Sequence, residues 1–529
     1  MIRKLEKETV MALFTPSESP AIVVKEVDLT GGVPNVQSTT GAFVGEFRWG
    51  PVEQATLIDN EATLAATFGS PDDNSGRAVD FLSAAYFLRY SNAMQVVRMV
   101  DSDAANSTDV SQGTQPTIKN LDDFNTQQAS LDSDENIFIG KYPGVLGNSL
   151  QISVCPQSAT DSAFDNWAYS SSFDAAPGTS TFATGVGATN DEMHVAVIDQ
   201  DGLFTGTRGE VLETFPFVSK ASNAKARDGT SNYALDVINA RSQYLWMAGF
   251  GASDTFDSAA GSDAVSGTDY STAARDVRTT SLANGADADG ISAGRYLTGF
   301  DLFEDKDQIT VDFLIAPGMA SRADQTTVVN DLVSTAQQTR KDAVVVTSPA
   351  RPDIVNVSSA ATQTTNAVAT SATFTNSSYL IVDNNYLKVY DKYNDKYRFI
   401  PAASSTAGIM AATDTNAAPW FSPAGPRRGQ YLGITSLAYT PNKSQRDTLY
   451  KNGVNPIANI PGQGVLLFGD KTKLARPSAF DRINVRRLFL VIERAVALAA
   501  RNTLFEFNDE FTRAEFVNIV EPFLREIQG

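Results

Sequence analysis

The sequence predicts a multidomain protein of mixed α/β and β structure, in which an inner α/β domain carries sequence-inserted β-rich domains. Three observations lead to this fold class. The chain has 529 residues, which corresponds to three or four domains at about 150 residues each. Strand and helix patterns alternate near both ends of the chain. Between these two regions lie Ser/Ala/Gly/Asp-rich stretches at 157–190 and 251–290. The chain therefore leaves an α/β unit through polar segments and later returns to it.

The α/β unit begins near the N-terminus. AIVVKEVDLT (21–30) alternates as a strand does, and GAFVGEFRWGPVEQATLI (41–58) predicts two strands joined by a Gly-Pro turn. Residues 60–68 and 77–90 are predicted helices, and in the second the apolar side chains recur at three-to-four spacing. MQVVRMV (94–100) is almost continuously apolar, which is typical of a strand buried on both faces.

A second clear α/β pattern follows the polar stretches. QITVDFLIAPGM (308–319) and DAVVVTSPA (342–350) predict strands with a helix over 326–340 between them, and this spacing indicates a right-handed parallel crossover. A polar zone at 355–378 has no such pattern. The remaining predictions are short strands within 130–200, a helix and a strand over 231–249, a hairpin over 378–401, a helix over 445–452, a strand over 464–469, and helices over 479–500 and 513–528.

Composition excludes several classes of function. The chain has 42 Lys and Arg against 61 Asp and Glu, a net charge of −19, which argues against nucleic acid or an anionic membrane as partner. Cys155 and His194 are the only cysteine and histidine, so a disulfide framework and a multi-His metal centre are excluded within one chain. There is no apolar run of 18 residues, and we expect no membrane insertion.

Short motifs that suggest chemistry are better explained structurally. GVLLFGDKT, from Gly464, resembles a phosphate-binding loop, but Asp470 breaks the spacing and VLLF reads as a strand. Ser222 and Lys225 fit S-x-x-K without its partner motifs, and the Asp101/Asp103 and Asp287/Asp289 pairs lack the other ligands of a calcium loop. We therefore expect no catalytic residue, metal or cofactor.

Basic residues concentrate near the C-terminus, against the acidic background. They are Lys471, Lys473, Arg476, Arg482, Arg486, Arg487, Arg494 and Arg501, and only Asp481 and Glu493 are acidic in that stretch. Several of these cations share one face of a predicted helix. Two interpretations stay open: a solvated helix face, or a basic stripe that meets an acidic partner such as another copy of this chain.

A resemblance to a known family emerges from longer segments. The chain resembles the contractile-tail sheath proteins of T-even-type myophages, and the matches keep the family's order from residue 11 to the end. The segments that carry the resemblance are MALFTPSESPAIVVKEVDLT (11–30), GAFVGEFRWGPVEQATLIDNEATLAATFG (41–69), YPGVLGNSLQISV (142–154), LDVINARSQYLW (235–246), VDFLIAPG (311–318), KDAVVVTSPARPD (341–353), PAASSTAGIMAATD (401–414), GVNPIANIPGQGVLLFGDKT (453–472), INVRRLFLVIERAV (483–496) and FEFNDEFTRAEFVNIVEPFL (505–524).

The resemblance implies a structural, non-enzymatic virion protein. Sheath subunits of this family stack as hexameric rings in a helix around a tail tube, and contraction drives the tube through the host envelope for genome ejection. Energy is stored at assembly, so no nucleotide or other cofactor is implied. The implied partners are other copies of the chain, the tail tube protein, and baseplate and tail terminator proteins. The implied location is the contractile tail, with host cytoplasm during assembly.

The resemblance also implies roles for particular residues. The strand Ile22, Val23, Val24, Lys25, Glu26 and Val27 is the expected linker that adds to a neighbouring subunit by β-augmentation. Lys471, Lys473, Arg482, Arg486, Arg487 and Arg494 become candidates for tube or inter-subunit contacts. The predicted division is a linker arm (1–20), an inner α/β domain (21–100 and 351–470), an inserted outer β-rich domain (101–200), a second inserted α/β domain (201–350) and a tube-proximal helical domain (471–529).

Two departures from the family accompany these expectations. Residues 1–10 precede the usual start near Met11, and family members continue past LREIQG into further strands. We therefore expect the last domain to lack its C-terminal strands and polymerisation to be impaired.

Three alternatives stay open. The first is a sheath of a type VI or related contractile injection system, which shares the inner domain. The second is an envelope-polymer hydrolase that uses a carboxylate pair, since 61 acidic residues allow many spatial pairs. The third is a soluble surface or capsid-like module, which only the composition supports.

Overall fold

The computed structural model describes residues 38–528 apart from 110–114, 134–135, 158–161, 252–258, 272–276, 289 and 502–503. The predicted arm strand from Ile22 to Val27 lies outside the described residues. The chain divides into two compact units, of which one is Gln37–Glu493 and the other contains the residues from Arg494 onward.

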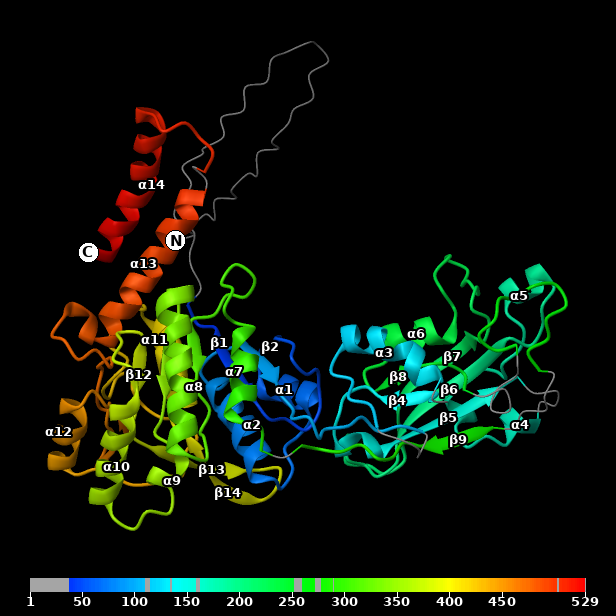
Figure 1. Ribbon diagram of the computed structural model, residues 1–529, viewed down its shortest axis with the longest axis horizontal. Coiled ribbons are helices and arrows are strands. Elements are labelled where there is room, and N and C mark those ends of the chain that lie inside the picture. The colour runs from blue at the N-terminus through cyan, green and yellow to red at the C-terminus, as the bar shows by residue number, and fades with distance from the viewer. Residues whose placement is uncertain are drawn as a thin grey trace, which may run out of the picture. The chain divides into compact units, whose positions relative to one another are not determined.

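A six-stranded sheet forms the base of the larger unit (Figure 1). Its order is β12-β11-β10-β1-β3-β2, and only the edge pair β2–β3 is antiparallel. The predicted crossover is confirmed, because β10 and β11 are parallel neighbours. The strands are β1 (Gly41–Gly45), β2 (Thr56–Ile58), β3 (Met94–Arg98), β10 (Phe313–Ile315), β11 (Val344–Thr347) and β12 (Leu380–Val382).

Helices cover both faces of this sheet, which explains its apolar strands. In β1, Phe43 packs in one core with α2 and α11, whereas Ala42 and Val44 pack in the other core with α7 and α8. Alternate side chains of a strand point to opposite faces, so one strand supplies both cores. The helices of the base are α1 (Glu61–Phe68), α2 (Ser75–Phe87), α7 (Ala293–Asp301), α8 (Arg322–Ser334), α9 (Arg351–Ile354), α10 (Ala360–Thr373), α11 (Ala403–Asn416) and α12 (Lys443–Lys451).

Two small antiparallel sheets complete the base. The predicted hairpin is β13 (Tyr386–Asp391) with β14 (Lys396–Pro401), and β15 (Ser436–Leu437) extends it. A second pair consists of β16 (Ile457–Ile460) and β17 (Gly464–Leu467). α13 (Ile483–Arg501) begins in the larger unit, and α14 (Glu510–Gln528) belongs to the other.

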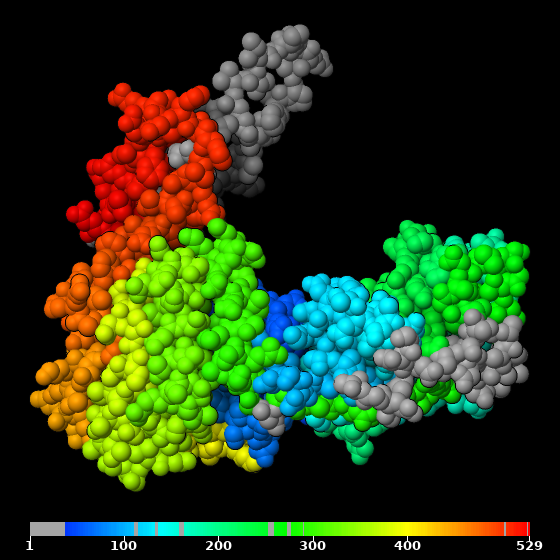
Figure 2. Space-filling view, in the orientation of Figure 1, coloured from blue at the N-terminus to red at the C-terminus, as the bar shows by residue number. Residues whose placement is uncertain are grey.

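Residues 101–288 are inserted between β3 and α7 and are antiparallel in character. A four-stranded sheet has the order β7-β6-β5-β9, and β4 pairs with β8. The elements are β4 (Phe138–Gly140), β5 (Leu150–Pro156), β6 (Glu192–Asp199), β7 (Glu210–Ser219), β8 (Leu245–Met247), β9 (Arg278–Ser281), α3 (Leu121–Ser133), α4 (Ser162–Asp165), α5 (Thr181–Val186) and α6 (Ala234–Arg241). Figure 2 shows these residues, in cyan and green, as one continuous body.

A buried arginine fastens the insertion to the base. Arg98, at the end of β3, donates to the carbonyls of Phe47 (2.8 Å), Gly50 (3.0 Å) and Pro143 (2.7 Å). Burial lowers the pKa of Arg98 to about 10. Because Pro143 belongs to the insertion, one side chain links two loops of the base to the inserted domain.

The predicted fold class is confirmed, but the strand pairing differs from the predicted domain boundaries. β6 and β7 are adjacent strands of one sheet, so the sheet crosses the predicted boundary at residue 200. β10 and β11, predicted as part of a separate domain over 201–350, belong instead to the sheet of the base, where β10 pairs with β1 and β11 pairs with β10. The reason is that long-range strand pairing, which local patterns do not encode, decides which segments share a sheet.

Candidate functional site

Most cations of the basic segment from Lys471 to Arg487 make contacts within the chain. Lys471 Nζ donates to the carbonyl of Tyr450 (3.1 Å), and Lys473 Nζ donates to that of Asn452 (2.9 Å). These carbonyls belong to the last turn of α12, where backbone acceptors lack helical partners and favour cations. Burial lowers the pKa of Lys473. The two lysines therefore cap α12.

Arg487 is the most deeply fixed cation of the segment. Its guanidinium forms a two-point ion pair with the Asp414 carboxylate on α11, and the side chains are 5% and 3% exposed. The same guanidinium donates to the carbonyls of Met410 (3.1 Å) and Ser38 (3.2 Å). It also lies 4.8 Å from the centre of the Phe313 ring of β10. Arg487 therefore fastens the first turns of α13 to the sheet domain.

Arg486 and Arg482 make different contacts. The guanidinium of Arg486 lies between the rings of Tyr379 (4.3 Å) and Phe480 (4.2 Å), and burial lowers its pKa. Arg482 Nη1 donates to Asp470 Oδ1 (2.6 Å), and 43% of the Arg482 side chain is exposed. The hydrogen bond to Asp470 raises the pKa of Arg482.

A cavity of about 370 Å³ lies beside these residues and is strongly cationic. Lys451, Lys471, Lys473 and Arg476 line it, with Asp481 as the acidic residue of the lining. Sequence reasoning identified three of these cations but missed Lys451, because its place at the end of α12 becomes relevant only when the chain folds back. Of the other predicted contact residues, Arg494 belongs to the other unit.

Sequence reasoning also missed that Asp414 pairs with Arg487 and that Asp470 pairs with Arg482. Asp414 is 73 positions from Arg487, and no local signal relates the two. Asp414 is the last residue of the segment PAASSTAGIMAATD (401–414), but the sequence alone does not indicate that this segment forms a buried helix.

His194 and Ser222, two residues weighed above for catalysis, are both engaged within the chain. His194 Nε2 lies 2.7 Å from the carbonyl of Ala175, the backbone N–H of Phe217 donates to Nδ1 (3.0 Å), and the ring stacks on Phe173. Burial lowers the pKa of His194. Ser222 donates to Asp263 (2.6 Å). These contacts occupy both ring nitrogens of His194 and the hydroxyl of Ser222.

The buried carboxylates Glu46 and Asp80 also fit a hydrolase poorly. Asp80 accepts from the backbone N–H of Glu46 (2.9 Å) and from the Tyr296 hydroxyl (3.0 Å), and burial raises its pKa to about 8. The space beside Glu46 is about 10 Å³, which is room for about one water. A polymer substrate cannot reach this pair.

Two further searches of the described residues bear on function. Within the described ranges, no three His, Cys, Asp or Glu side chains gather as a metal site requires. Among the described helices, none combines the length and apolar character needed to cross a membrane.

Comparison with known proteins decides the family. The chain is 30% identical to the tail sheath protein of Salmonella phage ViI, over 98% of this chain and 89% of that one. The chain belongs to the phage tail sheath protein family. It is also 30% identical to the tail sheath protein of Enterobacteria phage T4, over 96% of this chain and 89% of that one. The predicted role, a structural component of a bacteriophage contractile tail, is confirmed.

Two further comparisons agree with this membership. Residues 289–473 match the family described as the phage tail sheath protein central domain. The crystal structure of the sheath tail protein of Listeria innocua has the same fold, with a TM-score of 0.55, 13% identity, and coverage of 94% of this chain and 85% of that one. The relatives are structural proteins rather than enzymes.

Proposed function

We propose that copies of this chain stack as hexameric rings in a helix around a tail tube, and that contraction of this sheath drives the tube through the host envelope. The observation that carries the proposal is the 30% identity to phage tail sheath proteins over nearly the whole chain. We place assembly in the host cytoplasm, with baseplate and tail terminator proteins at the two ends of the sheath.

We propose further that the sheath works without enzymatic activity or a bound nucleotide. The segment that resembles a phosphate loop contains the strand β17, and Asp470, which follows the second glycine, pairs with Arg482. Lys471, which would have to reach a phosphate, caps α12 instead. These contacts argue against a phosphate site at this segment, and we infer that the energy for contraction is stored at assembly instead.

The basic residues divide into two proposed roles. Arg486 and Arg487 set the position of α13, because both are buried and paired within the chain. Lys471 and Lys473, with the exposed Arg476, present a cationic cavity to an acidic tube or subunit surface. Charged contacts of this kind affect association rate and salt dependence more than they affect folding.

Arg476→Glu tests the second role. The side chain of Arg476 is exposed and makes no hydrogen bond with a described residue, so reversal of its charge leaves the fold intact. We expect several-fold weaker binding to the tail tube protein at low salt, since like charges repel at an interface. Arg227→Glu in the insertion is the matched control, because Arg227 is also exposed. Equal binding by the two variants would contradict the proposed contact.

The arm strand from Ile22 to Val27 is the other proposed contact between subunits. Val24→Pro removes a backbone donor and prevents strand addition, whereas Val24→Thr keeps both the donor and the strand preference. In negative-stain electron microscopy, we expect the threonine variant to assemble as far as the unaltered chain does, and the proline variant to remain as isolated particles. Tubules of normal length from the proline variant would exclude this arm as a linker.

A further inference from the structure

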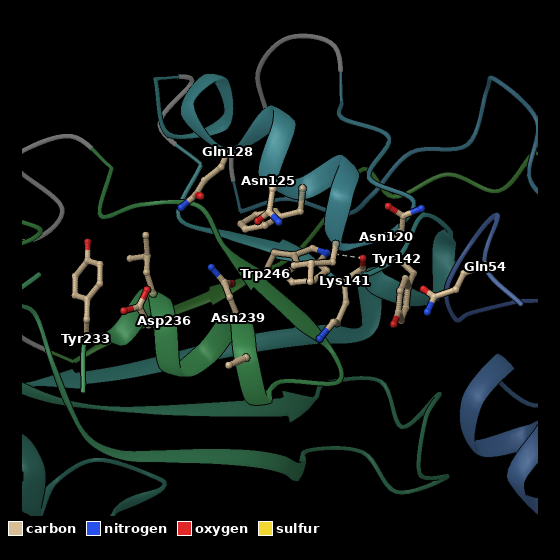
Figure 3. A pocket seen from close by; sticks show the side chains of 14 residues that line it. Gln54, Asn120, Asn125, Gln128, Lys141, Tyr142, Tyr233, Asp236, Asn239 and Trp246 are labelled. Atoms are coloured by element: carbon tan, nitrogen blue, oxygen red, sulfur yellow. Dashed lines mark hydrogen bonds between the residues drawn. The ribbon is translucent and has the colours of Figure 1, made fainter. Parts of the chain in front are cut away.

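A cavity of about 590 Å³ is lined by residues of the insertion, mainly from helices α3 and α6, and by Gln54 of the base. Figure 3 shows Asn125 and Gln128 on the wall formed by α3, Asp236 and Asn239 on the wall formed by α6, and Trp246 with Lys141 between them. The cavity has no part in the contacts proposed above.

The walls of the cavity are held in place by contacts on their inner side. Asn239 on α6 donates to the carbonyl of Met247 (2.9 Å) and accepts from its N–H (2.8 Å), which fixes α6 to β8. Phe124 on α3 stacks on Trp246 of the same strand, with ring centres 4.6 Å apart. Both helices are thus fastened to β8, and the cavity between them is formed before any ligand arrives.

The charged groups of the lining are both engaged within the chain. Lys141 Nζ donates to the carbonyl of Ser242 and lies 4.5 Å from the centre of the Trp246 ring, and burial lowers its pKa. Asp236 accepts from the Ser231 hydroxyl (2.6 Å). The lining thus holds one cation and one carboxylate, both hydrogen-bonded within the chain, and five carboxamides, of which Asn120, Gln128 and Asn239 also bond within the chain.

Hydrogen-bonding groups at the rim have no partner among the described residues. These are the exposed side-chain amides of Gln54 and Asn125 and the hydroxyls of Tyr142 and Tyr233. Burial raises the pKa of Tyr233 to about 12 from its ordinary value of about 10, and its hydroxyl is a neutral donor at physiological pH in either case. Each carboxamide offers both donors and an acceptor, and each hydroxyl can do either.

We propose that this cavity binds a neutral oligosaccharide. Sugar hydroxyls are donors and acceptors at once, and the carboxamides and tyrosines match both roles within a space large enough for a few residues of a glycan chain. An anionic polymer would meet a chain of net negative charge without a free cation in this lining. A peptide would gain from a free strand edge or a deep apolar socket, whereas two helices form these walls and their apolar side chains, Leu121, Phe124, Leu235 and Ala240, alternate with polar ones.

The test uses the whole chain and an array of neutral and anionic oligosaccharides together with uncharged peptides. We expect retention on neutral glycans only. The double variant Gln54→Ala with Asn125→Ala removes two partnerless amides and should weaken binding about tenfold, as the loss of two hydrogen bonds implies. Gln337→Ala with Gln338→Ala removes two exposed amides from the base and should leave binding unchanged.

Tyr142→Phe provides a second readout that keeps the ring and its edge contact with Trp49. It removes only a hydroxyl, so a several-fold loss of glycan binding with an unchanged unfolding curve assigns that hydroxyl to the ligand. Retention of no neutral glycan, equal retention of anionic glycans, or retention of peptides alone would overturn the proposal. So would equal glycan binding by the two double variants.

Discussion

Removal of the Arg487 guanidinium should strongly destabilise the base of the molecule. The ion pair with Asp414 is 5% and 3% exposed, so Arg487→Met leaves a carboxylate buried without its counter-charge. The loss of one partner of a buried pair costs about 3–5 kcal/mol of unfolding free energy. Loss of the guanidinium also leaves the carbonyls of Met410 and Ser38 without their donor.

An exposed pair gives the matched comparison for this variant. Arg208 and Asp201 are 77% and 42% exposed, and Arg208→Met should cost at most about 1 kcal/mol. The double variant Arg487→Met with Asp414→Leu removes both charges and should recover most of the lost stability, because a buried ion pair replaced by apolar groups is often neutral. The change in unfolding free energy of the double variant, compared with the sum of the changes for Arg487→Met and Asp414→Leu alone, then gives the coupling energy of the pair.

Hydrogen exchange measured by mass spectrometry is the appropriate assay. Tryptophan fluorescence alone would mix the base with the insertion, because Trp246 lies in the insertion and Trp420 in the base. Peptides from α11 and α13 should lose protection in Arg487→Met, while peptides from β5 and β6 should keep theirs. Equal protection of α11 in Arg487→Met and Arg208→Met would refute the role assigned to this pair.

Two further predictions concern the buried core. The pKa of Asp80 is raised to about 8, so its contribution to stability is fully present below the unfolded pKa of about 3.9 and is lost as pH rises through 8. Asp80→Asn keeps an acceptor and should flatten the pH dependence of the unfolding free energy between pH 4 and 8. An unchanged pH dependence would contradict the assignment. Gly299→Ala places a Cβ 2.5 Å from Val44 Cγ1 and should lower the unfolding free energy by about 1–3 kcal/mol. Gly185→Ala meets nothing within 4 Å and should be neutral or slightly stabilising. Equal melting temperatures of the two variants would show that the sheet and α7 can move apart.

The elements with strong local signals were predictable from the sequence. The apolar run 94–100 became β3, the strands around residues 313 and 345 became parallel neighbours, and the long helix near 479–500 became α13. In each case the side chains that face the core are apolar and recur at the period of the element.

The elements that sequence reasoning missed are those stabilised by tertiary packing. α10 lies inside the polar zone 355–378, and its Gln363, Thr364, Thr370 and Ser371 are buried against neighbouring elements. α11 is built largely from small residues and is buried on nearly every face, so it shows no amphipathic periodicity. Local propensity for helix is weak in both segments, and the rest of the fold determines their structure.

The candidate site shows the same limit. The cluster of cations was visible in the sequence, but whether each one faces solvent or a buried acid depends on partners such as Asp414 on α11. Sequence reasoning left a solvated helix face and a partner-binding stripe open. In the structure, Arg486 and Arg487 are buried, Arg482 is partly exposed, and Lys471 and Lys473 line a cationic cavity.

Electron microscopy of the protein from the complete reading frame tests the central claim most directly. The protein would be mixed with the tail tube protein and imaged by negative stain at low and high salt. We predict hollow tubules with a regular ring repeat and sixfold end-on views, formed in a salt-dependent manner. Monodisperse particles under every condition, even with the tube protein present, would contradict the proposed assembly.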